Sequence, residues 1–358
     1  TPTTPTTPTT TTTPVTTTAP TTTTTTTKVH YTVGQFDYPQ EETNMPGRPA
    51  TLTQEQRLAL EEFRQLLNPI DIAQIKMPHE DDDKMLFRVL RADDFNVKLC
   101  KASWDVTLKW RKENQIFDQM AESATSMIFG NTVTLSQILK KYPYGIKGVD
   151  KRGRPLSFKL GGVIDHSIFT ELGVAKIVLW EAVVASKTLY YRLPRASIEA
   201  KTHIENYVQI VDLNGMGITS FGGNMKTALK DSIRLCGDHF PETMGCTYII
   251  NAPWYFRTVW AVVRTFMEPQ TARKVNVCGD VSELHTAIDM DMLPIEYGGS
   301  GKLGLHSIKD LYTPDACWEL EQGRPKKWGE DPYAGSDSRL LQVVQESKED
   351  VDLDAKDV

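Results

Sequence analysis

Residues 239–254 read HFPETMGCTYIINAPW, and this stretch decides the fold of the chain. Its centre, residues 247–251, is apolar almost throughout, as expected for a β-strand in a sheet that is covered on both faces. The residues that follow, 254–266, form a helical pattern. A buried strand that leads into a helix is typical of a sheet domain of the α/β or α+β class.

The segment 254–266 is unusual because apolar side chains cover nearly its whole circumference. An ordinary surface helix carries an apolar arc of roughly 100° or somewhat more. Two interpretations stay open: a fully buried helix, or a helix that covers a lipid pocket and faces a membrane on its other side. Arg257 and Arg264, seven residues apart, would lie on one side and contact anionic lipid head groups. The apolar positions are Trp254, Tyr255, Phe256, Val259, Trp260, Val262, Val263 and Phe266.

Beyond residue 135, strand patterns alternate with long helical patterns. Before it, Thr53 opens a capping box, residues 81–83 place carboxylates at a helix start, and Asn96 suits an N-cap. These signals predict a small helical bundle in front of the sheet domain. We expect strands at 156–160, 207–213, 247–251 and 275–278, and helices at about 175–190, 223–236 and 254–266.

The two ends of the chain differ in composition from the middle. Residues 1–27 are almost pure Thr and Pro, which cannot offset chain entropy by burying apolar surface, so a solvated tail is favoured over a mucin-like stalk. Residues 335–358 are rich in Asp, Glu, Lys and Ser, which predicts a mobile acidic end. We divide the chain into a tail and linker at 1–50, a helical domain at 51–120, a sheet domain at 135–302 and an extension at 303–358.

Composition excludes several classes of protein. The chain has 358 residues, 40% of them hydrophobic, and a net charge of -6, so a basic face for nucleic acid is not expected. Its five cysteines form no C-x-x-C pair and its seven histidines no H-E-x-x-H, so we expect no metal site and a reducing compartment. No apolar run approaches the roughly 20 residues that span a bilayer, so any membrane contact would be peripheral.

Three motifs of enzymes and nucleotide-binding proteins fail on inspection. Residues 215–220 begin like a dinucleotide fingerprint but lack its third glycine, which indicates a tight turn after a strand. Residues 298–302 resemble a phosphate loop, but Glu296 takes the earlier glycine position and Leu303 follows the lysine. A G-x-S-x-G nucleophile elbow is absent from the sequence. We therefore expect no catalytic residues and no enzymatic activity.

The opening stretch resembles the signature of CRAL-TRIO lipid-transfer proteins, which reads YPERMG and then YIINAP. Over residues 51–302 the chain is similar to fungal-type phosphatidylinositol/phosphatidylcholine transfer proteins. The resemblance implies an α/β fold in which a β-sheet floor and covering helices enclose a deep apolar pocket, with residues 254–266 as a gate helix. Further matching pieces, in the same order and spacing, are 87–92 with 109–112, 150–155, 191–194, 211–215, 266–271 and 293–299.

The resemblance also implies contacts to a head group. Family members that hold phosphatidylinositol use a Glu in the signature and a Thr and a Lys after the gate helix, which match Glu242, Thr271 and Lys274. A carboxylate suits the inositol hydroxyls, while a hydroxyl and an ammonium suit the phosphate. The alternative is that Lys274 is a solvated surface charge and Thr271 a turn residue. The family commonly has Arg where this chain has Asp93 and Thr243, so fewer positive charges would surround an inositol head group.

Phosphatidylcholine is held in the family by an aromatic and hydroxyl cage, whose positions here are Ile146, Ser157, Tyr207 and Gln209. A choline cation favours aromatic faces, and most of that cage is replaced, so phosphatidylinositol is the expected cargo. We expect the pocket and gate to be formed by Tyr207, Gln209, Trp254, Phe256, Val259, Trp260, Val263 and Phe266, with Arg257 and Arg264 in contact with the membrane.

We therefore expect a cytoplasmic, monomeric protein that associates with membranes peripherally and needs no cofactor besides a bound phospholipid. It would bind a single phospholipid, first of all phosphatidylinositol, and transfer it or present it at membranes. A regulatory interaction module or a carrier of another hydrophobic ligand is an alternative, and the module would hold no co-purifying lipid. A lipid-ester hydrolase is a further alternative, which would lose turnover with one Ser or Cys substitution.

Overall fold

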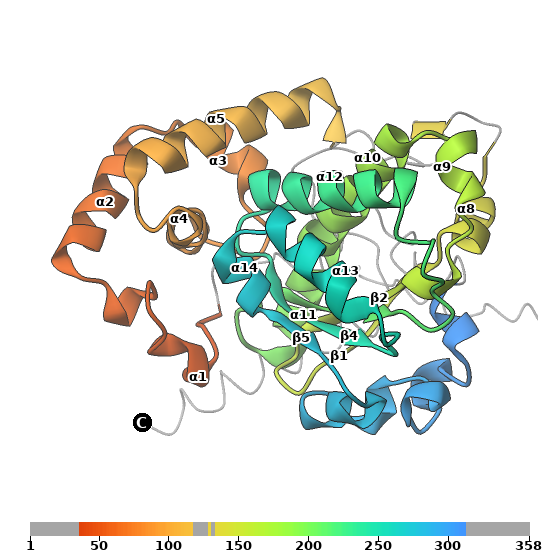
Figure 1. Ribbon diagram of the computed structural model, residues 1–358. Helices are drawn as coiled ribbons and strands as arrows, with labels where there is room; N and C mark the ends of the chain where they lie inside the picture. The colour runs from red at the N-terminus through yellow and green to blue at the C-terminus, as the bar shows by residue number, and fades with distance from the viewer. Residues whose placement is uncertain (1–35, 117–127, 130–132, 313–358) are drawn as a thin grey trace, which may run out of the picture.

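A five-stranded sheet forms the centre of the computed structural model, which describes residues 36–116, 128–129 and 133–312 (Figure 1). The strand order is β1-β2-β3-β4-β5, with β1 antiparallel to β2 and the other neighbours parallel. The four expected strands are confirmed, and β1 is added at one edge. The strands are β1 Tyr144–Val149, β2 Pro155–Leu160, β3 Tyr207–Asp212, β4 Met244–Ile250 and β5 Val275–Val277.

One face of the sheet packs into a closed core. Side chains alternate between the two faces of a strand, so Leu156 and Phe158 of β2 point the same way as Val208 and Ile210 of β3. A series of 3-10 turns, coloured blue in Figure 1, covers this face and adds Leu284, Ile288, Leu293, Tyr297, Leu305 and Leu311 to the core. The turns are η5 Val281–Thr286, η6 Met290–Met292, η7 Ile295–Tyr297, η8 Lys302–Gly304 and η9 Ile308–Tyr312.

The long helices lie over the opposite face of the sheet (Figure 1). They are α10 Val174–Lys187, α12 Gly223–His239 and α13 Phe256–Val263. The expected helices are confirmed, although the last is shorter because a 3-10 turn, η4 Arg264–Phe266, replaces its end. The shorter elements are η2 Gly161–Val163, α8 Leu135–Lys141, α9 Ser167–Glu171, a π-helical turn Thr188–Arg192, α11 Leu193–Ala200 and α14 Pro269–Arg273.

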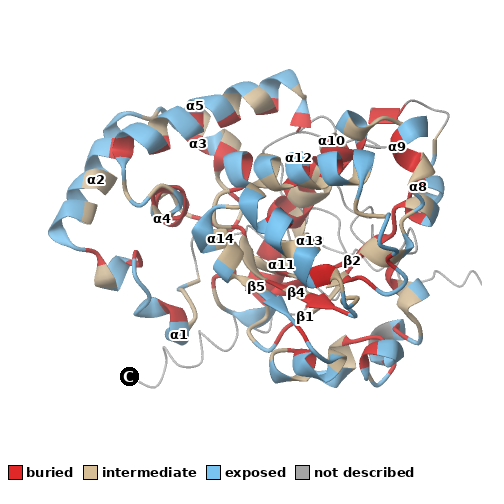
Figure 2. Ribbon diagram, viewed as in Figure 1, coloured by how far each residue is buried: buried red, intermediate tan, exposed pale blue. Residues whose placement is uncertain are grey.

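A helical bundle precedes the sheet and contains the three expected helix starts. Thr53 and Gln56 form a capping box, while Asp81 and Asn96 accept hydrogen bonds from backbone N–H groups as N-caps. The core of the bundle includes Phe63 and Trp104, packed edge to face at 5.9 Å, and α4 is its most buried helix (Figure 2). The helices are α2 Gln54–Gln65, α3 Pro69–Ile75, α4 Asp82–Ala92 and α5 Val97–Glu113.

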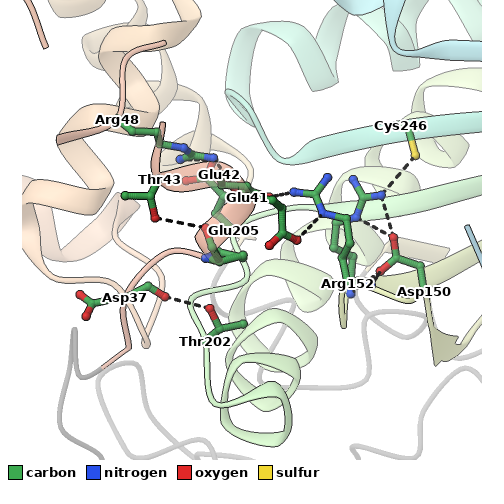
Figure 3. Close-up of polar contacts among 12 residues, drawn as sticks. Asp37, Glu41, Glu42, Thr43, Arg48, Asp150, Arg152, Thr202, Glu205 and Cys246 are labelled. Carbon is green, nitrogen blue, oxygen red and sulfur yellow. Dashed lines mark hydrogen bonds and ion pairs between the residues drawn. The ribbon is translucent and has the colours of Figure 1, made fainter. Parts of the chain in front are cut away.

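An arm at residues 36–51, with α1 Gln40–Thr43 and η1 Pro49–Thr51, joins the bundle to the sheet through buried ion pairs (Figure 3). Arg48 lies 2.5 Å from the carboxylate of Glu42 and 2.7 Å from that of Glu205. Glu42 also pairs with Arg152, beside β2, and Glu205 lies 2.6 Å from Arg91 of α4. These contacts tie three distant parts of the chain together.

Buried histidines lie next to the same arm. The backbone carbonyl of Asp37 accepts a hydrogen bond from the backbone N–H of His203 at 2.7 Å, and the Tyr38 ring meets the His203 ring edge to face at 5.0 Å. The His79 ring is 4.9 Å from that of His203, and its Nε2 lies 2.8 Å from the Ile204 carbonyl oxygen. Burial lowers the pKa of His79 to about 4 and that of His203 well below its ordinary value.

Several sequence predictions concern local features. Gly215 has a φ of +86° three residues after the end of β3, which confirms the tight turn there. Across the part of the chain that the structure describes, no helix combines the length and apolar character needed to cross a membrane, and no three metal-binding side chains gather. The Thr/Pro-rich residues 1–27 and the acidic residues 335–358 lie outside the described residues.

Candidate lipid-binding site

A cavity of about 1290 Å³ lies between the second face of the sheet and the helices α10, α12 and α13. It exceeds the roughly 300–1,000 Å³ of most small-molecule sites. Its walls are mainly apolar, which suits a large apolar ligand more than a soluble metabolite. Wall residues include Val211 of β3 and Leu213 just after it, Val184 of α10 and Leu189 of the π-helical turn that follows α10, and Leu229 and Ile233 of α12.

The floor of the cavity contains a row of polar side chains. Ser157, Gln209 and Thr247 occupy neighbouring strands in register, and Val275 ends the row on β5. Tyr207, two residues before Gln209, also lines the cavity, and burial raises the pKa of its hydroxyl. Tyr207 and Gln209 therefore line the cavity, as expected from the sequence. The row offers hydrogen-bonding groups to a ligand in the cavity.

Helix α13 separates this cavity from solvent. Phe256 and Trp260 stack with ring centroids 6.4 Å apart on the cavity side, together with Val259, Val263 and Phe266. Arg257 and Arg264 are exposed and do not line the cavity. The interpretation of a fully buried helix is therefore wrong, because one side of α13 lines the cavity and its other side is exposed, as the pale blue parts of α13 in Figure 2 show.

Trp254 departs from the expected arrangement. The sequence grouped it with the pocket residues, but its side chain points outward and is 89% exposed. Helical spacing does not apply to it, because α13 begins only at Phe256, after the turn that follows Pro253.

The three expected head-group residues come together at the cavity although they belong to different elements. Lys274 Nζ donates a hydrogen bond to Glu242 Oε2 at 3.1 Å, and Thr271 lies on α14, one turn before Lys274. All three line the cavity, so Lys274 is not simply a solvated charge. Glu242 has a φ of +59°, in the left-handed region that glycine favours. The cluster presents an acceptor, a hydroxyl and a cation to the same space.

A second polar cluster in the cavity was missed by the sequence reasoning. Lys159 Nζ lies 3.1 Å from Glu181 Oε2, and the Tyr142 hydroxyl donates to the other carboxylate oxygen. Although burial alone would raise the pKa of Glu181, Lys159 and Tyr142 hold it below its ordinary value. A signal was present: Glu181 is the one charge in the apolar run VLWEAVV, and Lys159 alternates onto the same strand face as Ser157.

Comparison with known proteins shows the family of this chain. Residues 139–299 match the CRAL/TRIO domain. The chain is 30% identical over 281 residues to the SEC14 cytosolic factor of Eremothecium gossypii, an alignment that covers 76% of this chain and 85% of that protein. It is 30% identical over 292 residues to the CRAL-TRIO domain-containing protein YKL091C of Saccharomyces cerevisiae, covering 78% and 90% of the two chains.

A longer relative supports the same family, and a solved structure shares the fold. The phosphatidylinositol/phosphatidylcholine transfer protein SFH12 of Arabidopsis thaliana is 32% identical over 250 residues, 69% of this chain but only 44% of that protein. The chain thus spans less than half the length of such relatives. The crystal structure of Sfh5 shares the fold with a TM-score of 0.58 at 16% identity, covering 83% of this chain and 98% of that one. The protein therefore belongs to the CRAL-TRIO family.

Proposed function

We propose that the protein holds one phospholipid in its cavity and transfers or presents it at membrane surfaces without changing it chemically. The observation that carries this proposal is the apolar cavity of about 1290 Å³ closed on one side by α13. Movement of α13 at a bilayer would replace cavity contacts by membrane contacts, so that apolar surface never meets water. The names of relatives such as SFH12 support the phospholipid class.

Phosphatidylinositol is our proposed ligand. Glu242 supplies an acceptor for inositol hydroxyls, while Lys274 and Thr271 supply a cation and a hydroxyl for the phosphate. Phosphatidylcholine is the weaker candidate, because the floor presents Ser157 and Gln209 where aromatic faces would hold a choline cation. The proposal includes a helical lead domain at 51–120, a lipid-binding domain at 135–302, and a monomer that associates with cytoplasmic membranes peripherally.

Filling the cavity tests whether a lipid occupies it. Ala185 of α10 lines the cavity, and we expect Ala185→Trp to remove the co-purified phospholipid because the indole takes the space of an acyl chain. Native mass spectrometry of the purified protein measures the loss directly. Ala261→Trp is the matched control, since Ala261 lies on the exposed side of α13. Absence of lipid from the parent protein, or equal lipid content in both variants, would contradict the proposal.

The head-group assignment has its own test. We expect Lys274→Ala to weaken transfer of labelled phosphatidylinositol between liposomes on the order of tenfold to a hundredfold, the usual effect of losing a charge-assisted hydrogen bond. Glu242→Ala should act in the same direction. Lys302→Ala is the control, because Lys302 also pairs with a carboxylate, that of Asp291 at 2.5 Å, but away from the cavity. Equal transfer by the Lys274→Ala and Lys302→Ala variants would refute the assignment.

A further inference from the structure

Three loops meet where the central parallel strands end. Leu160, Asp212 and Ile250 are paired in register at the ends of β2, β3 and β4, so the chain leaves the sheet three times at one edge. We call residues 161–164, 213–222 and 251–257 the loop edge, which includes Phe256 and Arg257 at the start of α13. The loops touch one another: a Cβ on Gly162 would collide with the Asn214 carbonyl oxygen. The loop edge is therefore one continuous surface.

The second and third loops also contact each other and the end of β3 through side chains. The Tyr255 hydroxyl donates a hydrogen bond to the Met216 carbonyl oxygen, and Asn251 Nδ2 donates to Asp212 Oδ1 at 2.9 Å. Leu213 and Met216 pack with Phe256 in one apolar cluster. The positions of the loops are thus set by the fold.

A large apolar side chain projects into solvent from each loop. Val163 is 57% exposed, Ile218 66% and Trp254 89%. A single exposed apolar residue is ordinary on a protein surface, but several on adjoining loops form a patch that indicates an interaction site.

The charge of the loop edge distinguishes it from the rest of the surface. Arg257 is its one charged residue, although 24% of the chain is charged. Asp212, just before the edge, is turned inward to the Tyr297 hydroxyl at 2.8 Å, and Asp165, just after it, lies 3.9 Å from the Lys141 ammonium. An edge with an exposed Trp and a single charge, that of the Arg257 guanidinium, matches the interfacial region of a bilayer, where Trp is enriched and anionic lipids attract cations.

The loop edge is also continuous with the cavity. Met216 and Phe221 line the cavity from the same loop that carries the outward Ile218, and Phe256 lines it two residues after the outward Trp254. We propose that the loop edge is the membrane-docking surface, which inserts Trp254, Ile218 and Val163 into a lipid bilayer and places the cavity at α13 against it. This inference rests on the proposed function, because it names the surface at which a lipid would enter and leave.

Co-sedimentation with vesicles of phosphatidylcholine and phosphatidylserine tests the docking surface. We expect Ile218→Ser and Trp254→Ala each to weaken vesicle binding on the order of tenfold, the usual effect of removing a buried apolar side chain. Ile70→Ser is the matched control, since Ile70 is 75% exposed on α3 of the helical bundle, and it should bind as the parent does. Brominated lipids should quench fluorescence in the parent, and Trp254→Phe should lose that quenching.

The outcomes separate docking from lipid holding. Equal loss of vesicle binding by Ile70→Ser and Ile218→Ser, or unchanged quenching in Trp254→Phe, would overturn the inference. So would a parent protein that ignores vesicles but self-associates in a way that Trp254→Ala abolishes, because the loop edge would then be a protein interface. Native mass spectrometry of the same samples reports on the cavity alone. A parent without cavity lipid that still docks through this edge would refute the proposed function and support the docking surface.

Discussion

Replacing Glu205 by alanine is expected to lower the free energy of unfolding by about 3–5 kcal/mol, the usual cost of breaking a buried ion pair from one side. The Glu205 side chain is nearly inaccessible to solvent and serves both Arg48 and Arg91. Although burial alone would raise the pKa of Glu205, the two guanidiniums hold it below its ordinary value. Without the carboxylate, two buried cations would lose a shared counter-ion.

Urea-induced unfolding measures this loss. Glu199→Ala is the matched control, because Glu199 pairs with Arg195 on the surface of α11 at 2.8 Å and such pairs contribute about 0.3–0.5 kcal/mol. Glu205→Gln, which keeps the shape but removes the charge, should fall between the two. The result that would contradict the argument is an equal shift in the urea midpoint for Glu205→Ala and Glu199→Ala.

Stability is expected to fall steeply as the pH is lowered from about 6.5 towards 4. The pKa of His79 is about 4 in the folded protein because the ring is buried, against 6.5 for an ordinary histidine. Between these values the unfolded chain binds more protons than the folded one, so acid favours unfolding. For His79 the loss at pH 5 relative to pH 7 is about 2 kcal/mol. His203, whose pKa is also lowered by burial, acts in the same direction.

Unfolding by urea at a series of pH values tests this dependence. His79→Gln keeps a donor near the Ile204 carbonyl but cannot titrate. Between pH 7 and pH 5 this variant should therefore lose less stability than the parent, and the difference should be about the 2 kcal/mol assigned to His79. The same substitution at His306, an exposed histidine, is the control. A pH profile for His79→Gln that parallels the parent would disprove the role of His79.

Local sequence rules predicted the elements whose signals are local. The capping box at Thr53 and the N-cap at Asn96 are complete within four residues, so the helix starts followed from the sequence. Strand β1 was not predicted. It is an edge strand that pairs only with β2, and its register is irregular between Ile146 and Val149. Helix α3 had its signal in Asn68 followed by Pro69, an N-cap and a proline at the first helical position.

The site was predicted in part. The family signature led to Glu242 and Lys274, two residues that meet at the cavity, because the positions of a motif can be carried over one by one. The pair of Lys159 and Glu181 left no motif, since its partners come from a strand and a helix that are adjacent only in the folded chain. Trp254 was placed in the pocket because helical periodicity was assumed to apply two residues before α13 actually begins. Spacing along a sequence predicts a direction only inside a regular element.

The ion pairs of the arm have a consequence for synthesis of the chain on the ribosome. Arg48 and Arg91 emerge long before Glu205, and at 5–20 residues per second the delay for Arg48 is roughly ten to thirty seconds. During that time the helical bundle can form its apolar core around Phe63 and Trp104, while Arg91 of the bundle and Arg48 of the arm still lack their shared carboxylate. The nascent bundle can thus have a packed core before its buried ion pairs form. Those pairs form only after the segment before β3, which contains Glu205, has been synthesised.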